Sequence, residues 1–123
     1  MQAFASRGFA AALLLACSIL RPAPAGAHAI IIAAAPAPGA VLHSRNLSVQ
    51  LRFNSRIDLA RSRLSLIGPD AAARTLPLGN SVGPDVLATE VTGLAPGQYR
   101  LRWQVLGIDG HITRGDIPFE IAR

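Results

Sequence analysis

The segment Leu94-Ala95-Pro96-Gly97-Gln98-Tyr99-Arg100-Leu101-Arg102-Trp103-Gln104-Val105 joins a turn to a strongly alternating stretch. From Tyr99 onward, apolar and polar residues occupy alternate positions. In a β-strand this period of two places all apolar side chains on one face and all polar side chains on the other. The segment therefore predicts a strand that covers a core with one face and meets water with the other.

The position of Tyr99 adds a second signal. It follows a Leu-x-Pro-Gly turn and begins the predicted strand. This arrangement resembles the tyrosine corner of immunoglobulin-like sandwiches, in which the phenol hydroxyl bonds back to the backbone of the turn. Trp103 has the same parity as Tyr99, and we expect both aromatic side chains to face the core.

Outward from this segment, short apolar stretches alternate with turns rich in Gly, Pro, Asp and Asn. Leu47–Phe53 alternates as clearly as residues 99–105 do. Residues 58–63, "DLARSR", could form one helical turn, but no long helix is predicted. Dense turns between short strands predict an all-β fold, a small immunoglobulin-like or cupredoxin-like Greek-key β-sandwich of about seven strands. The other expected strands are Ile30–Ala34, Leu64–Ile67, Val86–Val91 and Ile117–Ile121, with a short edge piece at Ala71–Leu76.

Residues 1–27 are typical of a secretory signal peptide. Arg7 precedes an uncharged apolar run, Gly8–Leu20, and the segment ends in Ala25-Gly26-Ala27. Such a run is too short for a transmembrane helix, and the small residues at its end predict cleavage between Ala27 and His28. We therefore expect a signal peptide at 1–27 and one domain at 28–123. An uncleaved anchor, or a lipoprotein cut before Cys17 at "LLAC", are the alternatives.

Composition narrows the chemistry of the expected domain. Cys17 is the only Cys and Met1 the only Met, so residues 28–123 contain no sulfur. The domain thus has no disulfide and no soft ligand for Cu(I) or an iron–sulfur cluster. Its basic residues are all Arg, spread over alternate positions without a basic stripe. This pattern predicts a solvated face and no nucleic-acid binding.

Few residues remain for catalysis or metal binding. No Gly-x-Ser-x-Gly elbow and no Gly-rich phosphate loop occur. In Gly107-Ile108-Asp109-Gly110-His111, the acid and the imidazole are two residues apart. In an extended backbone both side chains would point the same way and could bind one cation. An ordinary Asp-Gly turn is the alternative interpretation.

His28 offers two ligands if it becomes the first residue of the mature chain. Its α-amine and its ring Nδ1 could then form a chelate with one metal ion, releasing protons as they bind. The isoleucine run at Ile30–Ile32 would hold this end in the sandwich, whereas chain ends usually fray. The alternative is that His28 is simply the first residue after the cut.

From His28 to Arg123 the chain resembles the CopC family of periplasmic copper-binding proteins. The matching segments, in order, are "AHAIIIAAAPAPGAVL", "LSVQLRFNSRID", "GLAPGQYRLRWQVLGIDGHITRG" and "IPFEIAR". The resemblance implies a cupredoxin-like sandwich in which His28, Asp109 and His111 bind one Cu(II) per chain. It also implies a periplasmic location and a CopD-like membrane protein as partner. Three nitrogens and one carboxylate oxygen suit tetragonal Cu(II).

Two departures from the family pattern modify this expectation. Some members also bind Cu(I) through a Met-rich loop, which residues 28–123 lack. Relatives often have His-x-His at the mature N-terminus, but Ile30 is the third residue here. The absence of Met leads us to expect a protein that binds Cu(II) only. We also expect a monomer. His43 is expected to be a solvent-exposed histidine, with an auxiliary metal contact as the alternative.

The expected function is a copper carrier or buffer, not an enzyme. One alternative function is a histidine-brace copper oxidase. Such an enzyme needs Cu(I) to react with oxygen, whereas the carboxylate of Asp109 would favour Cu(II). The other rival is an adhesion or scaffold sandwich, in which Asp109-Gly110-His111 is only a turn.

Overall fold

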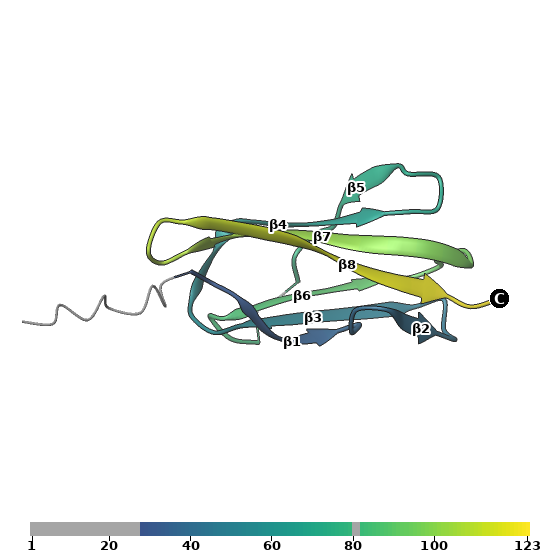
Figure 1. The fold of residues 1–123 in the computed structure, drawn as a ribbon, viewed down its shortest axis with the longest axis horizontal. Coiled ribbons are helices and arrows are strands. Elements are labelled where there is room, and N and C mark those ends of the chain that lie inside the picture. Colours follow the sequence, from purple (N-terminus) through teal and green to yellow (C-terminus); the bar gives the residue numbers. More distant parts are fainter. Residues whose placement is uncertain (1–27, 80–81) are drawn as a thin grey trace, which may run out of the picture.

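The computed structural model describes residues 28–79 and 82–123, which form a two-layer β-sandwich (Figure 1). The predicted signal peptide, its cleavage site and Cys17 lie outside the described residues. Within the described residues, one sheet has the strand order β1-β3-β6 and the other β2-β8-β7-β4-β5. The strands are β1 (Ile31–Ala35), β2 (Ala40–Leu42), β3 (Leu47–Phe53), β4 (Ile57–Ile67), β5 (Ala73–Thr75), β6 (Val86–Val91), β7 (Gly97–Gly107) and β8 (Ile112–Ile121).

The predicted all-β sandwich is confirmed, and its core lies between the two sheets. In β3 the side chains alternate strictly between buried and exposed, as the period of two in the sequence predicts. The largest fully buried side chains are contributed by both layers, with Phe53 and Leu51 from β3 and Phe119 from β8. No helix in residues 28–79 and 82–123 is long and apolar enough to cross a membrane.

The tyrosine corner is present where the sequence predicts it. The Tyr99 hydroxyl donates a hydrogen bond to the Ala95 carbonyl oxygen at 2.6 Å. The ring is buried and stacks on Phe119 with 5.4 Å between centroids. Trp103 is partly buried and packs edge-to-face with Phe53 on the core side, as expected. These contacts fix the start of β7 and therefore the path of the β7–β8 hairpin.

The predicted helical turn at residues 58–63 is wrong, because these residues belong to β4. Asp58 pairs with Leu106 of β7 and Arg63 pairs with Gln104, so residues 59–62 lie opposite Val105 alone and form a large bulge. Inside the bulge the Ser62 hydroxyl donates to the Asp58 carbonyl at 2.6 Å, four residues back. This hydrogen bond closes the bulge across four residues.

The two ends of the sandwich carry different features. The β7–β8 hairpin turn and the start of β1 lie at one end, and the C-terminus lies at the other (Figure 1). β2, which the sequence did not predict, pairs in parallel with the last residues of β8. His43 directly follows β2 and is exposed. β8 has 10 residues, so His43 and His111 are separated by about 30 Å of strand.

Candidate metal centre

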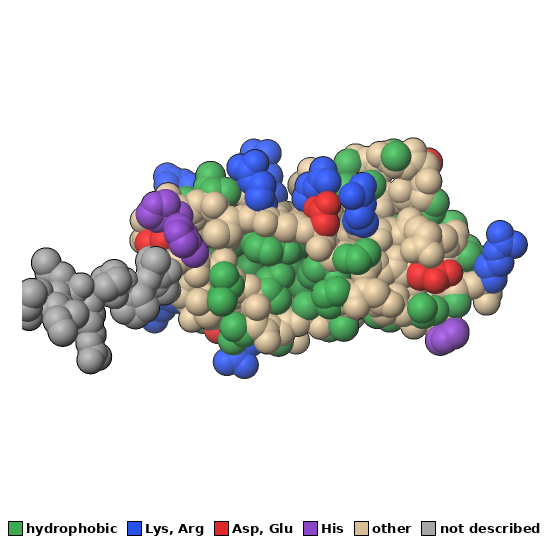
Figure 2. All heavy atoms as spheres, viewed as in Figure 1, with side chains coloured by type: hydrophobic (Ala, Val, Ile, Leu, Met, Phe, Trp, Pro, Cys, Tyr) green, Lys and Arg blue, Asp and Glu red, His purple; other side chains and the backbone are tan. Residues whose placement is uncertain are grey.

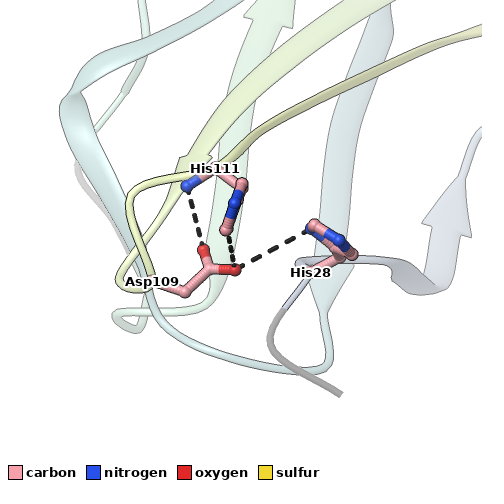
Figure 3. A group of neighbouring side chains, drawn as sticks. All are labelled: His28, Asp109 and His111. Atoms are coloured by element: carbon pink, nitrogen blue, oxygen red, sulfur yellow. Dashed lines mark hydrogen bonds and ion pairs between the residues drawn. The ribbon is translucent and has the colours of Figure 1, made fainter. Parts of the chain in front are cut away.

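Three side chains meet at the hairpin end of the sandwich (Figure 3). They are His28, Asp109 and His111, and one ligand atom from each lies within 4.8 Å of the others. Asp109 Oδ2 is 2.8 Å from Nδ1 of His111 and 3.8 Å from Nδ1 of His28. The two imidazole rings lie edge to face, with 4.8 Å between their centroids. The three residues predicted as metal ligands are thus neighbours in space.

A tight turn, and not an extended backbone, brings Asp109 and His111 together. The Gly107 N–H donates to the His111 carbonyl at 2.9 Å, and the Gly110 N–H donates to the Gly107 carbonyl at 3.0 Å. Gly110 has a φ of 81°, a conformation that glycine adopts without steric cost. Asp109 Oδ1 accepts the His111 N–H at 3.1 Å. The expected same-face geometry of a strand is therefore wrong, although the predicted proximity is confirmed.

The carboxylate of Asp109 is held in its charged form. Partial desolvation acts to raise its pKa, but this effect is outweighed by the hydrogen bonds from the His111 ring and backbone. The positive charge of His111 and His28, when they are protonated, acts in the same direction, and the net pKa of Asp109 is lowered. The site therefore presents an anionic oxygen to any cation that approaches it.

The ligands are accessible from solvent to different degrees. The side chain of His111 is 64% exposed and that of His28 is 50% exposed, whereas Asp109 is 13% exposed. Figure 2 shows two histidine side chains together at the hairpin end of the molecule. An ion could therefore enter and leave past the two exposed imidazoles, while the less exposed carboxylate of Asp109 lies on the protein side of the site.

The spacing suits a single metal ion after a small adjustment. Imidazole nitrogens bind transition metals at about 2.0–2.1 Å, so two ligands of one ion are at most about 4 Å apart. The present spread of 4.8 Å requires the exposed side chains to move inward by about 1 Å. Two imidazoles and one carboxylate form a donor set suited to Cu(II), Ni(II) or Zn(II).

Other features of the described surface lie away from this cluster. His43 does not take part in it. A groove of about 650 Å³ runs over β3 and β6 and is bordered by Pro77, Leu78 and Val82. It contains none of the three predicted ligands. The candidate site is consequently an exposed surface cluster at one end of the sandwich.

Sequence reasoning missed two residues that hold the backbone next to His28. The Thr113 hydroxyl donates to the Ala29 carbonyl at 2.8 Å. The Ile30 N–H donates to Asn54 Oδ1 at 2.9 Å. Both partners are far away in the chain, so no local motif marks them.

These features define a small β-sandwich domain with an exposed candidate cation site at one end. The chain belongs to the CopC family, because the family profile described as the CopC domain matches residues 31–122. That match includes Asp109 and His111 and starts three residues after His28.

Individual proteins agree with this assignment. The chain is 26% identical over 111 residues to Protein YobA of Escherichia coli K12, covering 88% of this chain and 89% of that protein. It is 26% identical over 128 residues to Copper resistance protein C of Xanthomonas campestris pv. juglandis, covering 96% and 98%. The crystal structure of CopC from Methylosinus trichosporium OB3b superposes with a TM-score of 0.68 at 26% identity, covering 77% of this chain and 94% of that one.

Proposed function

We propose that this protein is a copper carrier or buffer that binds one Cu(II) ion through His28, Asp109 and His111. The observation that carries the proposal is the convergence of these three donors within 4.8 Å. The name of the Xanthomonas relative, a copper resistance protein, supports copper as the metal. Cu(II) also has the highest affinity among the divalent first-row metals for sites of nitrogen and oxygen ligands.

Signal-peptide cleavage before His28 would complete the site. The new α-amine and the His28 Nδ1 would then form a chelate, and the donor set would become three nitrogens and one oxygen. The pattern of residues 1–27 predicts export by this route, and it supports the periplasmic location that the resemblance to the CopC family implies. A lipoprotein cut before Cys17 would keep the nitrogen of His28 in a peptide bond and would remove this chelate.

A carrier suits the site better than an oxidase does. The anionic, hard oxygen of Asp109 favours Cu(II), and residues 28–123 contain no Cys or Met to stabilise Cu(I). A catalytic copper site that cycles with oxygen would need the reduced state. The exposure of both imidazoles instead favours rapid exchange of the ion.

A CopD-like membrane protein is the proposed recipient of the copper. Exposed isoleucines flank the ligands in the sequence: Ile30 is 56%, Ile108 70% and Ile112 52% exposed. These exposed apolar side chains close to the proposed ligands in the sequence are the observation that supports direct docking of a protein partner. The carrier itself is proposed to act as a monomer.

The first test is native intact mass spectrometry of protein recovered from the exported fraction, with one equivalent of Cu(II) added. We expect a chain that starts at His28 and retains one copper ion. His28→Ala and His111→Ala should each lose the tightly bound copper. His43→Ala is the matched control, because it removes an exposed histidine at the far end of β8, and it should retain copper.

Either of two results would contradict the proposal. One is a chain that starts at His28 and binds no copper. The other is equal copper retention in the wild type and in His111→Ala, which would favour an adhesion or scaffold sandwich with a plain Asp-Gly turn.

A further inference from the structure

We propose that Thr113 and Asn54 are positioning residues that hold His28 in place for metal binding. This inference rests on the proposed copper site and adds two residues that make no contact with the metal themselves. His28 is exposed, but the residue that follows it is 1% exposed and belongs to the core. The chain therefore passes within one residue from Ala29, which is buried and hydrogen-bonded, to His28, whose side chain is exposed and can bind a metal.

Thr113 connects the two halves of the site directly. Its hydroxyl donates to the carbonyl of Ala29 at 2.8 Å, across 84 residues of sequence. Thr113 lies in β8, two residues after His111, whereas Ala29 is adjacent to His28 and precedes β1 of the other sheet. One side-chain bond thus links the segment that carries His28 to the start of β8, which directly follows His111.

Asn54 holds the same segment from a second side. The side-chain Oδ1 of Asn54 accepts a hydrogen bond from the backbone N–H of Ile30 at 2.9 Å. The backbone N–H of Asn54 donates to the carbonyl of Ile30 at 3.0 Å. These two bonds extend the β1–β3 pairing beyond its last registered pair, Ile31 with Phe53. Asn54 directly follows β3, so it anchors Ile30 to the three-stranded sheet while Thr113 anchors Ala29 to the five-stranded sheet.

The physical consequence is preorganisation of the His28 ligand. A chain terminus without such bonds frays, and ordering it on metal binding would lower the affinity. Here the three bonds hold the Cα atom of His28 opposite Asp109 before any ion arrives. Outer partners that orient metal ligands typically change affinity by about 10-fold to 100-fold when they are removed. We expect the loss of the Thr113 hydroxyl to weaken Cu(II) binding by about tenfold.

The experiment uses the mature protein that starts at His28 and compares four single variants. Thr113→Val removes the hydroxyl and keeps the branched shape, and Thr113→Ser keeps the hydroxyl. Asn54→Ala removes the Oδ1 acceptor of the Ile30 N–H at an exposed position. This variant tests the proposal if Thr113→Val fails to fold. Thr89→Val is the matched control, because the Thr89 hydroxyl also donates to a backbone carbonyl, that of Pro77, outside the metal centre.

Two measurements separate positioning from folding. Cu(II) affinity is measured by competition with a chelator, and the Cu(II) electron paramagnetic resonance spectrum reports the nitrogen ligands. Thr113→Val and Asn54→Ala should bind about tenfold more weakly, with altered nitrogen couplings. Thr113→Ser should restore both, and Thr89→Val should match the wild type.

The results also separate this inference from the proposed function. Absence of Cu(II) binding by the wild type would overturn the copper site itself. Normal binding by the wild type together with unchanged affinity and spectrum in Thr113→Val and Asn54→Ala would overturn only the positioning role. An equal loss of affinity in Thr89→Val would also overturn it, because the effect would then come from general destabilisation.

Discussion

Asp109 contacts His111 twice, through Oδ1 to its backbone N–H at 3.1 Å and through Oδ2 to its ring Nδ1 at 2.8 Å. The first contact closes the turn, and the second sets the orientation of the ring. A carboxylate that holds Nδ1 leaves Nε2 of the same imidazole for a metal, which is a common arrangement around metal-binding histidines. In the proposed copper site Asp109 would therefore act in two ways, as a ligand of the ion and as the residue that orients the His111 ring.

Replacement Asp109→Asn should weaken Cu(II) binding by about 10-fold to 100-fold without unfolding the domain. The amide retains an oxygen that can accept the His111 N–H, but the negative charge beside the ion is lost. Affinity from chelator competition and the unfolding midpoint in urea are the two readouts. Unchanged affinity in a folded Asp109→Asn protein would exclude a role for this carboxylate in metal binding.

Copper affinity should fall steeply between about pH 8 and pH 5, because protons compete with the metal for the imidazole and amine nitrogens. The pKa of Asp109 is lowered, so its carboxylate stays ionised to a lower pH than an ordinary aspartate does. The loss of affinity over this range should thus reflect protonation of nitrogen ligands alone. A titration series at fixed ionic strength tests this, and a flat profile would contradict a histidine-based site.

Much of the fold could be predicted from the sequence because each long strand has one face on the core. The alternation in residues 47–53 predicts β3 with the observed bounds, and that in residues 99–105 predicts the middle of β7. β2 has only three residues and carries no periodicity. It exists because the chain pairs there with the end of β8, a tertiary contact that no local pattern encodes. The bulge in β4 likewise depends on the pairing with β7, which is why residues 58–63 on their own predict a helical turn.

The residues around the candidate site also differ in whether the sequence alone can identify them. Asp109 and His111 are only two residues apart in the sequence and chemically distinctive, so a local motif identifies them. Thr113 and Asn54 are ordinary polar residues whose partners lie 84 and 24 positions away in the chain. Their proposed role depends on how the two sheets are placed against each other, and their hydrogen bonds are visible only in three dimensions.

Gly107→Ala should disturb the metal centre although Gly107 is not a ligand. A Cβ atom at this position would lie 2.6 Å from Oδ1 of Asp109, which is closer than van der Waals contact allows. The carboxylate must then move away from the His111 N–H. We expect about tenfold weaker Cu(II) binding, as for other losses of ligand orientation, with an altered electron paramagnetic resonance spectrum.

Gly79→Ala is the control for this prediction. Among the described residues its Cβ would lie 3.4 Å from the Ala88 carbonyl oxygen, which the neighbouring backbone can accommodate. Equal copper binding by Gly107→Ala and Gly79→Ala would show that the Asp109 carboxylate has more freedom than the structure indicates.

A last prediction concerns acid stability and Asp116 on the outer face of β8. Arg102 donates to both oxygens of Asp116, at 2.9 and 3.0 Å. The hydrogen bond from Arg102 is the largest cause of a lowered pKa for Asp116. A lowered folded-state pKa means that the pair stabilises the protein above the unfolded pKa of about 3.9. This contribution disappears as the pH falls through the lower, folded-state value.

Asp116→Asn should consequently destabilise the protein at pH 7 and have no effect in strong acid. Because the pair is exposed to solvent, the difference in unfolding free energy at pH 7 should be less than about 1 kcal/mol. Urea unfolding of metal-free wild type and Asp116→Asn at a series of pH values measures this difference. A difference that grows as the pH is lowered below 4 would have the wrong sign and would contradict a stabilising ion pair.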